Sequence, residues 1–87
     1  MNWKLIRKTE HQFIVDSDGQ IAAHMDMSFD EETVFLDYAF VDPAFRGTGV
    51  GNFLVKEVIS QLKPEAKKIV PVCGYVQAVV RKNKLLE

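Results

Sequence analysis

Val41-Asp-Pro-Ala-Phe-Arg-Gly-Thr-Gly-Val-Gly51 is the stretch that decides the fold of this 87-residue chain. It follows a run of β-branched and aromatic residues, Thr33–Val41, and precedes residues 50–63, whose apolar side chains recur with a helical period. The pattern predicts a strand, a glycine-rich turn and a helix, in that order. Glycines let a ligand approach the backbone, and a helix start leaves N–H groups without partners, so the turn favours an anion. Arg46 adds a guanidinium that can hold a phosphate with two hydrogen bonds.

The glycine spacing excludes two better-known phosphate-binding turns. It is G-x-G-x-G, whereas a dinucleotide fingerprint is G-x-G-x-x-G within a longer run of alternating strands and helices. No Gly-Lys-Ser/Thr follows, as a Walker loop requires. A glycine-rich helix start with a purely structural role stays open as the alternative to anion binding.

Upstream of this stretch the chain predicts strands. Residues 12–15 and 20–28 indicate two strands joined by a hairpin at Asp18-Gly19, and residues 3–6 give a weaker strand signal. With Thr33–Val41 as the next strand, short turns predict an antiparallel meander. The alternation in residues 20–28 predicts one face made of Ile21, Ala23, Met25 and Met27, and another made of Ala22, His24 and Asp26.

Downstream the pattern predicts a helix, a strand and a second helix. Pro64 ends the helix of residues 50–63, residues 68–73 form a strand in spite of Pro71, and residues 75–86 form the second helix. A strand-helix-strand crossover makes the two strands parallel. The predicted fold class is therefore α+β, with a mixed, mostly antiparallel sheet and two helices in a single domain, residues 1–87.

Composition and net charge limit the classes of function that the chain can have. The net charge of -1 argues against nucleic-acid binding, and the basic run 81–84 is typical of a helix C-terminus, although interaction through that run is an alternative. Cys73 is the single cysteine, so an internal disulfide and a cysteine zinc site are excluded, and no metal is expected. No signal peptide or membrane span is visible, so no membrane partner is expected and we predict a cytoplasmic protein.

Two segments resemble the GNAT superfamily of N-acetyltransferases. Arg46-Gly-Thr-Gly-Val-Gly51, preceded by Val41-x-Pro43, resembles its acyl-CoA signature Gln/Arg-x-x-Gly-x-Gly/Ala. Lys68-Ile-Val-Pro-Val-Cys-Gly-Tyr-Val76 resembles the minimal, single-domain subgroup of roughly this length. The resemblance runs from about Phe13 to the end, with two departures. Tyr38-Ala39 stands where subgroup members often carry His-Thr, and the chain does not end in their proline-glutamate-tyrosine sequence.

This resemblance implies acetyl-CoA as acyl donor, an unknown amine as acceptor, and a monomer or weak dimer. The pyrophosphate would lie on the amides of Arg46, Gly47, Thr48, Gly49, Val50 and Gly51. The pantetheine arm would pair with Ala39, Phe40 and Val41, where two parallel strands part. Cys73, Gly74 and Tyr75 would lie across that gap, near the thioester.

The catalytic candidates each have a plainer alternative. Tyr75 can donate a proton to the leaving thiolate, or pack as an ordinary aromatic residue. Cys73 can accept the acyl group, or fill space as a small apolar residue. A backbone N–H at Phe40 or Val41 can stabilise the oxyanion.

General-base candidates are Asp37, Asp26 and His24, which otherwise belong to a solvated sheet face. The leading hypothesis is an acetyl-CoA-dependent N-acetyltransferase. The alternative is a non-catalytic acyl-CoA-binding or sensing module, because so short a chain leaves little room for an amine pocket.

Overall fold

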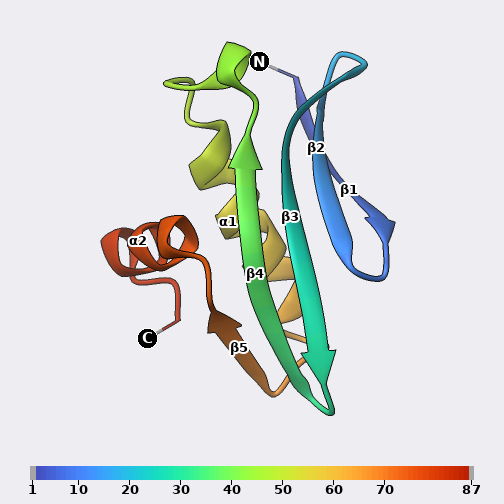
Figure 1. Cartoon of the computed structure of the whole chain (residues 1–87), viewed down its shortest axis with the longest axis vertical. Helices are drawn as coiled ribbons and strands as arrows, with labels where there is room; N and C mark the ends of the chain where they lie inside the picture. Colours follow the sequence, from blue (N-terminus) through green and yellow to red (C-terminus); the bar gives the residue numbers. More distant parts are fainter. Residues whose placement is uncertain (1, 87) are drawn as a thin grey trace.

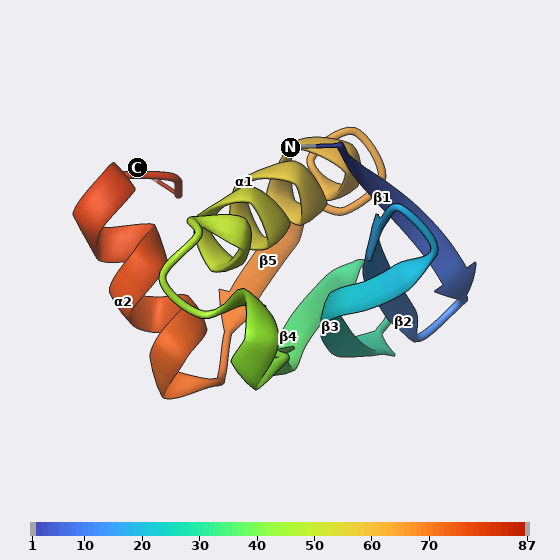
Figure 2. The same cartoon turned by 90° about the horizontal axis from the view of Figure 1, so that it is seen from above.

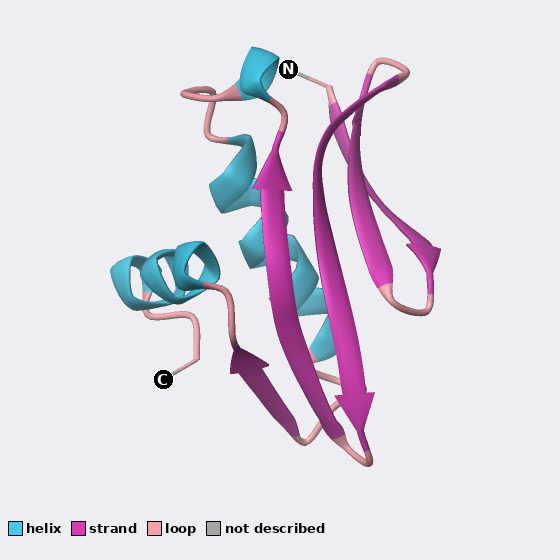
Figure 3. Ribbon diagram, in the orientation of Figure 1, coloured by secondary structure: helices cyan, strands magenta, loops and turns pink. Residues whose placement is uncertain are grey.

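A computed structural model describes residues 2–86, which form a five-stranded sheet and two α-helices (Figures 1 and 3). The elements are β1 (Trp3–Thr9), β2 (Gln12–Ser17), β3 (Gln20–Asp30), β4 (Thr33–Val41), the 3₁₀ turn η1 (Pro43–Phe45), α1 (Val50–Leu62), β5 (Lys68–Pro71) and α2 (Gly74–Asn83). The strands follow one another across the sheet in chain order. β1 to β4 are antiparallel and β5 is parallel to β4, which confirms the predicted fold class.

α1 packs along one face of the sheet and contacts β1, β2, β3 and β4 (Figure 2). Its apolar stripe meets the inward side chains of the strands in one hydrophobic core. The largest fully buried side chains are Phe13, Met25, Leu36, Leu54 and Leu62. The opposite face of β2 and β3 is not covered by a helix within residues 2–86, and this leaves one side of the sheet open.

One predicted face of β3 is wrong at its first residue. Ile21 was expected inward with Ala23, but its side chain is 49% exposed, whereas Ala22 is fully buried. The cause is a β-bulge: Val15 pairs with Ala23 and Asp16 pairs with Ile21, so Ala22 is an extra residue between two pairs. The bulge reverses the alternation for the residue that precedes it.

A second bulge lies in β4. Leu36 pairs with Met27 and Tyr38 pairs with Asp26, which leaves Asp37 between the two pairs. Leu36 on one side of it and Ala39 on the other are both buried. The bulge therefore changes which residues of β4 face the core, and also which backbone groups face the next strand.

β5 pairs with only the first half of β4. The ladder ends at Leu36 and Pro71, and the Leu36 carbonyl then accepts the N–H groups of both Val72 and Cys73. Pro71 occupies the last paired position, where a missing donor does little harm. The predicted strand of residues 68–73 thus ends two residues early, and α2 begins at Gly74. Residues 37–41 of β4 keep a free edge beside α2 (Figure 1).

The C-terminal basic run closes α2, as predicted. Arg81 and Lys82 lie in its last turn, and Lys84 adopts a left-handed conformation at the C-cap. No helix in residues 2–86 has the length and apolarity to cross a membrane. Within the same residues, no three His, Cys, Asp or Glu side chains gather where they could hold a metal ion.

Candidate functional site

The loop between β4 and α1 holds itself in shape. The Asp42 carboxylate accepts the N–H of Ala44 at 2.9 Å and starts η1. The Thr48 hydroxyl donates to the Phe45 carbonyl and accepts the N–H of Val50. These bonds fix the turn between strand and helix without using a ligand.

Glycine is required at two positions of this loop. Gly47 and Gly49 have φ of 80° and 91°, in the left-handed region that other residues seldom adopt. As a result, backbone N–H groups along the loop alternate between those that donate a hydrogen bond within the loop and those that do not. Those at positions 46, 48 and 50 donate within the loop. Those of Gly47, Gly49 and Gly51 have no acceptor among the described residues. Gly47 and Gly49 are exposed, whereas Gly51 is buried in the first turn of α1.

Arg46 joins this loop to the free edge of β4. Its Nε donates to the Val41 carbonyl at 3.2 Å, and its guanidinium lies 5.7 Å from the centre of the Phe40 ring. The arginine therefore covers a backbone acceptor that a bound ligand could use.

The free edge of β4 presents alternate backbone groups. The N–H of Asp42 donates to Ala22 on β3, so Phe40 also turns its backbone toward β3. Ala39 and Val41 turn theirs the other way, toward the gap left by β5. Of the two amides predicted to stabilise an oxyanion, that of Val41 faces the gap and that of Phe40 does not.

A pocket of about 220 Å³ lies along this edge. It brings together five of the predicted site residues: Ala39, Phe40, Val41, Arg46 and Tyr75. The side chains of two other predicted site residues have structural roles. The Thr48 hydroxyl forms a hydrogen bond within the loop, and Val50 is buried in the core.

Tyr75 lies over the start of α1. A Cβ added to Gly51 would collide with the Tyr75 hydroxyl, so glycine makes room for the ring. The Tyr75 side chain is 44% exposed, and partial burial raises its pKa above the ordinary value. A raised pKa keeps the hydroxyl protonated, as a proton donor requires.

Cys73 is half-buried at the N-cap of α2. Burial alone would raise the pKa of its thiol, but the backbone N–H groups of Val76, Ala39 and Tyr75 outweigh that effect and lower the pKa below the ordinary value. Two of these donors belong to the first turn of α2 and one to the free edge of β4. Such an environment favours the thiolate, the reactive form of cysteine.

Sequence reasoning missed Gln77. Its side-chain amide donates to the carbonyls of Pro71 at 3.1 Å and Val72 at 3.2 Å. It thereby satisfies the backbone where the chain leaves β5 and turns into α2. A polar residue in the first turn of a helix that follows a strand was the available signal.

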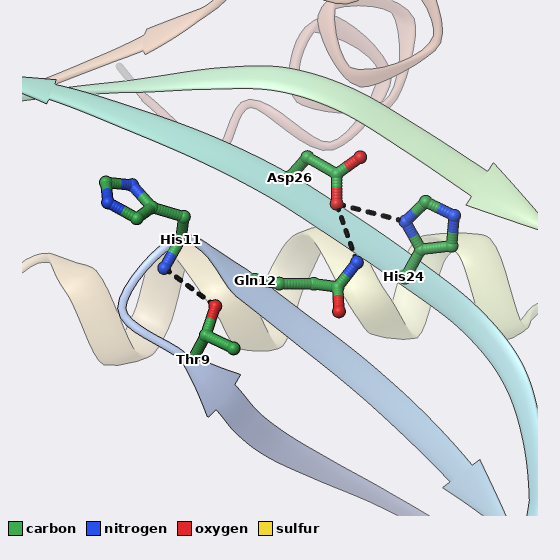
Figure 4. Close-up of polar contacts among 5 residues, drawn as sticks. All are labelled: Thr9, His11, Gln12, His24 and Asp26. Carbon is green, nitrogen blue, oxygen red and sulfur yellow. Dashed lines mark hydrogen bonds and ion pairs between the residues drawn. The ribbon is translucent and has the colours of Figure 1, made fainter.

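The general-base candidates lie away from this edge. Asp37 is the exposed bulge residue of β4. His24 and Asp26 lie on the open face of β3, with Nδ1 of the imidazole 3.2 Å from the carboxylate (Figure 4). The Tyr38 and Phe40 rings of β4 lie next to His24 on that face.

The sequence profile described as GCN5-related N-acetyl-transferase matches residues 12–87. This range begins with β2 and includes the loop, α1, β5 and α2. No curated protein matches the chain significantly.

Solved structures share the fold at low identity. A GCN5-like protein from Staphylococcus aureus superposes with a TM-score of 0.71 and 23% identity, over 93% of this chain and 80% of that one. The ribosomal-protein-S18-alanine N-acetyltransferase from Escherichia coli gives 0.66 and 19%, over 88% and 54%. The aminoglycoside N-acetyltransferase AAC(6')-Iy in complex with CoA gives 0.63 and 23%, over 86% and 68%. The chain spans about half the length of the E. coli enzyme, 54%.

Proposed function

The chain belongs to the GCN5-related N-acetyltransferase family, and we propose that it binds acetyl-CoA along the free edge of β4 and transfers the acetyl group to an amine. One observation carries the proposal. Three unused glycine N–H groups at the start of α1 adjoin a strand edge whose backbone also lacks a partner strand. The first feature suits a diphosphate and the second suits an extended arm with amide groups. Two structures of similar fold, described as holding CoA and acetyl-CoA, support this choice of ligand.

The loop before α1 and the free edge of β4, together called the groove, would each hold a different part of acetyl-CoA. Gly47, Gly49 and Gly51 would donate their N–H groups to the pyrophosphate, with Arg46 as the charged partner. To do so, Arg46 exchanges its bond with the Val41 carbonyl for phosphate oxygens. That exchange frees the strand edge for the pantetheine arm, which Ala39 and Val41 would pair with.

Cys73 and Tyr75 would carry the chemistry near the thioester, which supplies the activated acyl group. The Cys73 thiolate attacks the carbonyl carbon and forms a new thioester, while the bond to the coenzyme sulfur breaks. Tyr75 gives its proton to the departing thiolate. The N–H of Val41 faces the gap and would stabilise the oxyanion. The amine nitrogen then attacks the acetyl carbonyl carbon, and a C–N bond forms while the C–S bond to Cys73 breaks. Cys73 returns to the thiolate, and the proton that the nitrogen loses restores the Tyr75 hydroxyl.

The test combines binding, intact mass and turnover. The protein is titrated with acetyl-CoA by calorimetry, its mass is measured after incubation with acetyl-CoA, and thiol release is followed with a panel of primary amines. We expect binding, one acetyl group on Cys73, and thiol release with an amine. Tyr75→Phe should keep the affinity for acetyl-CoA and lower turnover by about 10²- to 10⁴-fold, the usual contribution of a general acid.

The outcomes separate the two hypotheses. Absence of acetyl-CoA binding contradicts the proposal as a whole. Binding without acetylation of Cys73 and without product from any amine identifies a non-catalytic acyl-CoA-binding module. Turnover that persists in Cys73→Ala keeps the enzyme but removes the cysteine from its pathway. Gel filtration of the same sample tests the predicted monomer or weak dimer.

A further inference from the structure

The backbone of Cys73 is held from two sides at the bend between β5 and α2. On the sheet side, the Leu36 carbonyl of β4 accepts the N–H of Val72 at 3.0 Å and that of Cys73 at 3.2 Å. On the helix side, the N–H of Gln77 donates to the Cys73 carbonyl at 2.9 Å. The N–H of Cys73 is therefore fixed by the sheet and its carbonyl by the helix.

Gln77 also holds this bend with its side chain. The amide nitrogen Nε2 carries two hydrogens, and it donates to the Pro71 carbonyl at 3.1 Å and to the Val72 carbonyl at 3.2 Å. Together with the backbone bond to Cys73, one residue thus binds the three consecutive carbonyls of residues 71, 72 and 73. Gln77 restrains the chain at each peptide group from the end of β5 to the start of α2.

The bulge in β4 explains why a side chain serves here. The ladder between β4 and β5 ends at Leu36 and Pro71, and the next residue of β4 is the bulge residue Asp37. A regular parallel ladder would supply further N–H groups from β4 to the carbonyls of β5. Beyond the bulge the two strands part, and the side chain of Gln77 donates to these carbonyls in place of a partner strand.

The properties of the Cys73 thiol depend on where its backbone lies. Burial raises its pKa, and the backbone groups of Val76, Ala39 and Tyr75 lower it by more. The side chains of Arg46 and Tyr75, which line the pocket along the free edge of β4, are not among these causes. Because hydrogen bonds weaken steeply as distance and angle change, a small shift of Cys73 would weaken the effect of these backbone groups.

We infer that Gln77 is a positioning residue, which holds the Cys73 backbone between the first turn of α2 and the free edge of β4. The inference rests on the proposed function, in which the Cys73 thiol receives the acetyl group. Gln77 acts on that reaction only through Cys73. Without its side-chain amide, the chain between β5 and α2 keeps the bonds to Leu36 and loses two of the three from Gln77.

The experiment compares Gln77→Met with Asn83→Leu. Met keeps the length of the side chain and has no N–H donor. Asn83 offers a matched control, because it is a half-buried amide of the same helix that donates to the Val79 carbonyl at 2.9 Å, and this bond does not involve the residues of the bend. Urea titration of both variants records how much stability each bond contributes.

The first readout is the pH profile of Cys73 alkylation by iodoacetamide, measured without acetyl-CoA. In Gln77→Met we expect the midpoint to rise by about half a pH unit or more, toward that of the urea-unfolded chain. Gln77→Asn keeps the amide on a shorter side chain that cannot reach both carbonyls, so its midpoint should rise too. Asn83→Leu should keep the wild-type midpoint.

The second readout is the rate at which acetyl-CoA acetylates Cys73, followed by intact mass at a pH below the wild-type midpoint. We expect a slower rate in Gln77→Met, because less of the thiol is ionised, and an unchanged affinity for acetyl-CoA by calorimetry. This combination separates a change at the thiol from a loss of ligand binding.

Two results would overturn the inference. The first is a wild-type alkylation midpoint in both Gln77 variants. The second is an equal rise in Asn83→Leu, which would mean that the midpoint follows stability in general. Failure of the proposed function is distinguishable, because it appears as absence of acetyl-CoA binding to the wild type, whereas alkylation is measured without that ligand.

Discussion

At Cys73, backbone groups from two elements act on the pKa of one thiol. Val76 and Tyr75 contribute as the first turn of α2, and Ala39 contributes from the free edge of β4. Burial disfavours a thiolate there, yet these donors prevail and the pKa falls. The lowered pKa of Cys73 thus depends in part on Ala39, which lies beyond the point where β5 stops pairing with β4.

Alkylation should show this lowered pKa. We expect the rate of Cys73 alkylation by iodoacetamide to rise with pH at a lower midpoint in the folded protein than in the urea-unfolded chain. Because folding favours the deprotonated form, the group stabilises the fold above the unfolded pKa, and that stabilisation is lost as pH falls through the folded pKa. A folded midpoint at or above the unfolded one would contradict the assignment.

Gly51 should control the position of Tyr75. In Gly51→Ala the new methyl group meets the end of a half-exposed side chain, so we expect Tyr75 to move aside with little change in thermal stability. Ring signals of Tyr75 measure the movement. Gly74→Ala is the steric control, because an added Cβ there meets no atom within 4 Å. Unchanged Tyr75 signals in Gly51→Ala would count against the described packing.

Among the elements, β4 has the largest part in the candidate site, because its two halves have different neighbours. Its first half completes a ladder with β5, and its second half, after the Asp37 bulge, offers Ala39 and Val41 to the groove. The bulge keeps the Tyr38 and Phe40 rings on the open face. One extra residue therefore sets both which backbone groups face the free edge and which rings lie on the open face.

Gln77 should stabilise the point where β5 ends. Gln77→Ala leaves the Pro71 and Val72 carbonyls without their donor, so we expect the free energy of unfolding to fall by about 1 kcal/mol. Urea titration measures the loss, and Gln61→Ala on the exposed side of α1 should change it little. Equal stability of the two variants would mean that the Gln77 bonds contribute nothing.

Across the whole molecule, the sequence predicted correctly those features that depend on a short stretch of neighbouring residues. Thr33–Val41 is a strand with the predicted bounds, and the glycine turn leads into α1 as expected, because period and turn chemistry act within a short window. Bulges depend on pairing between strands, so neither the outward turn of Ile21 nor the extra residue Asp37 could be read from one strand alone.

The candidate site likewise has features that the sequence predicts and features that depend on the folded structure. The glycine turn is visible in sequence, whereas the alternation of its free N–H groups, the bond from Arg46 to Val41 and the ring of Tyr75 over Gly51 need coordinates. The single domain, the cytoplasmic location and the monomer or weak dimer stay predictions.

The central claim is that the loop before α1 binds the pyrophosphate of acetyl-CoA through its backbone. Calorimetry on Gly49→Val tests it most directly, with Gly19→Val as control. Both glycines have nearly the same φ, 91° and 90°, and neither has an atom within 4 Å of an added Cβ, so the two variants carry matched backbone strain.

We predict that wild type and Gly19→Val bind acetyl-CoA alike and that Gly49→Val loses at least about tenfold in affinity, or ~1.4 kcal/mol. Equal affinity in all three proteins would contradict the account.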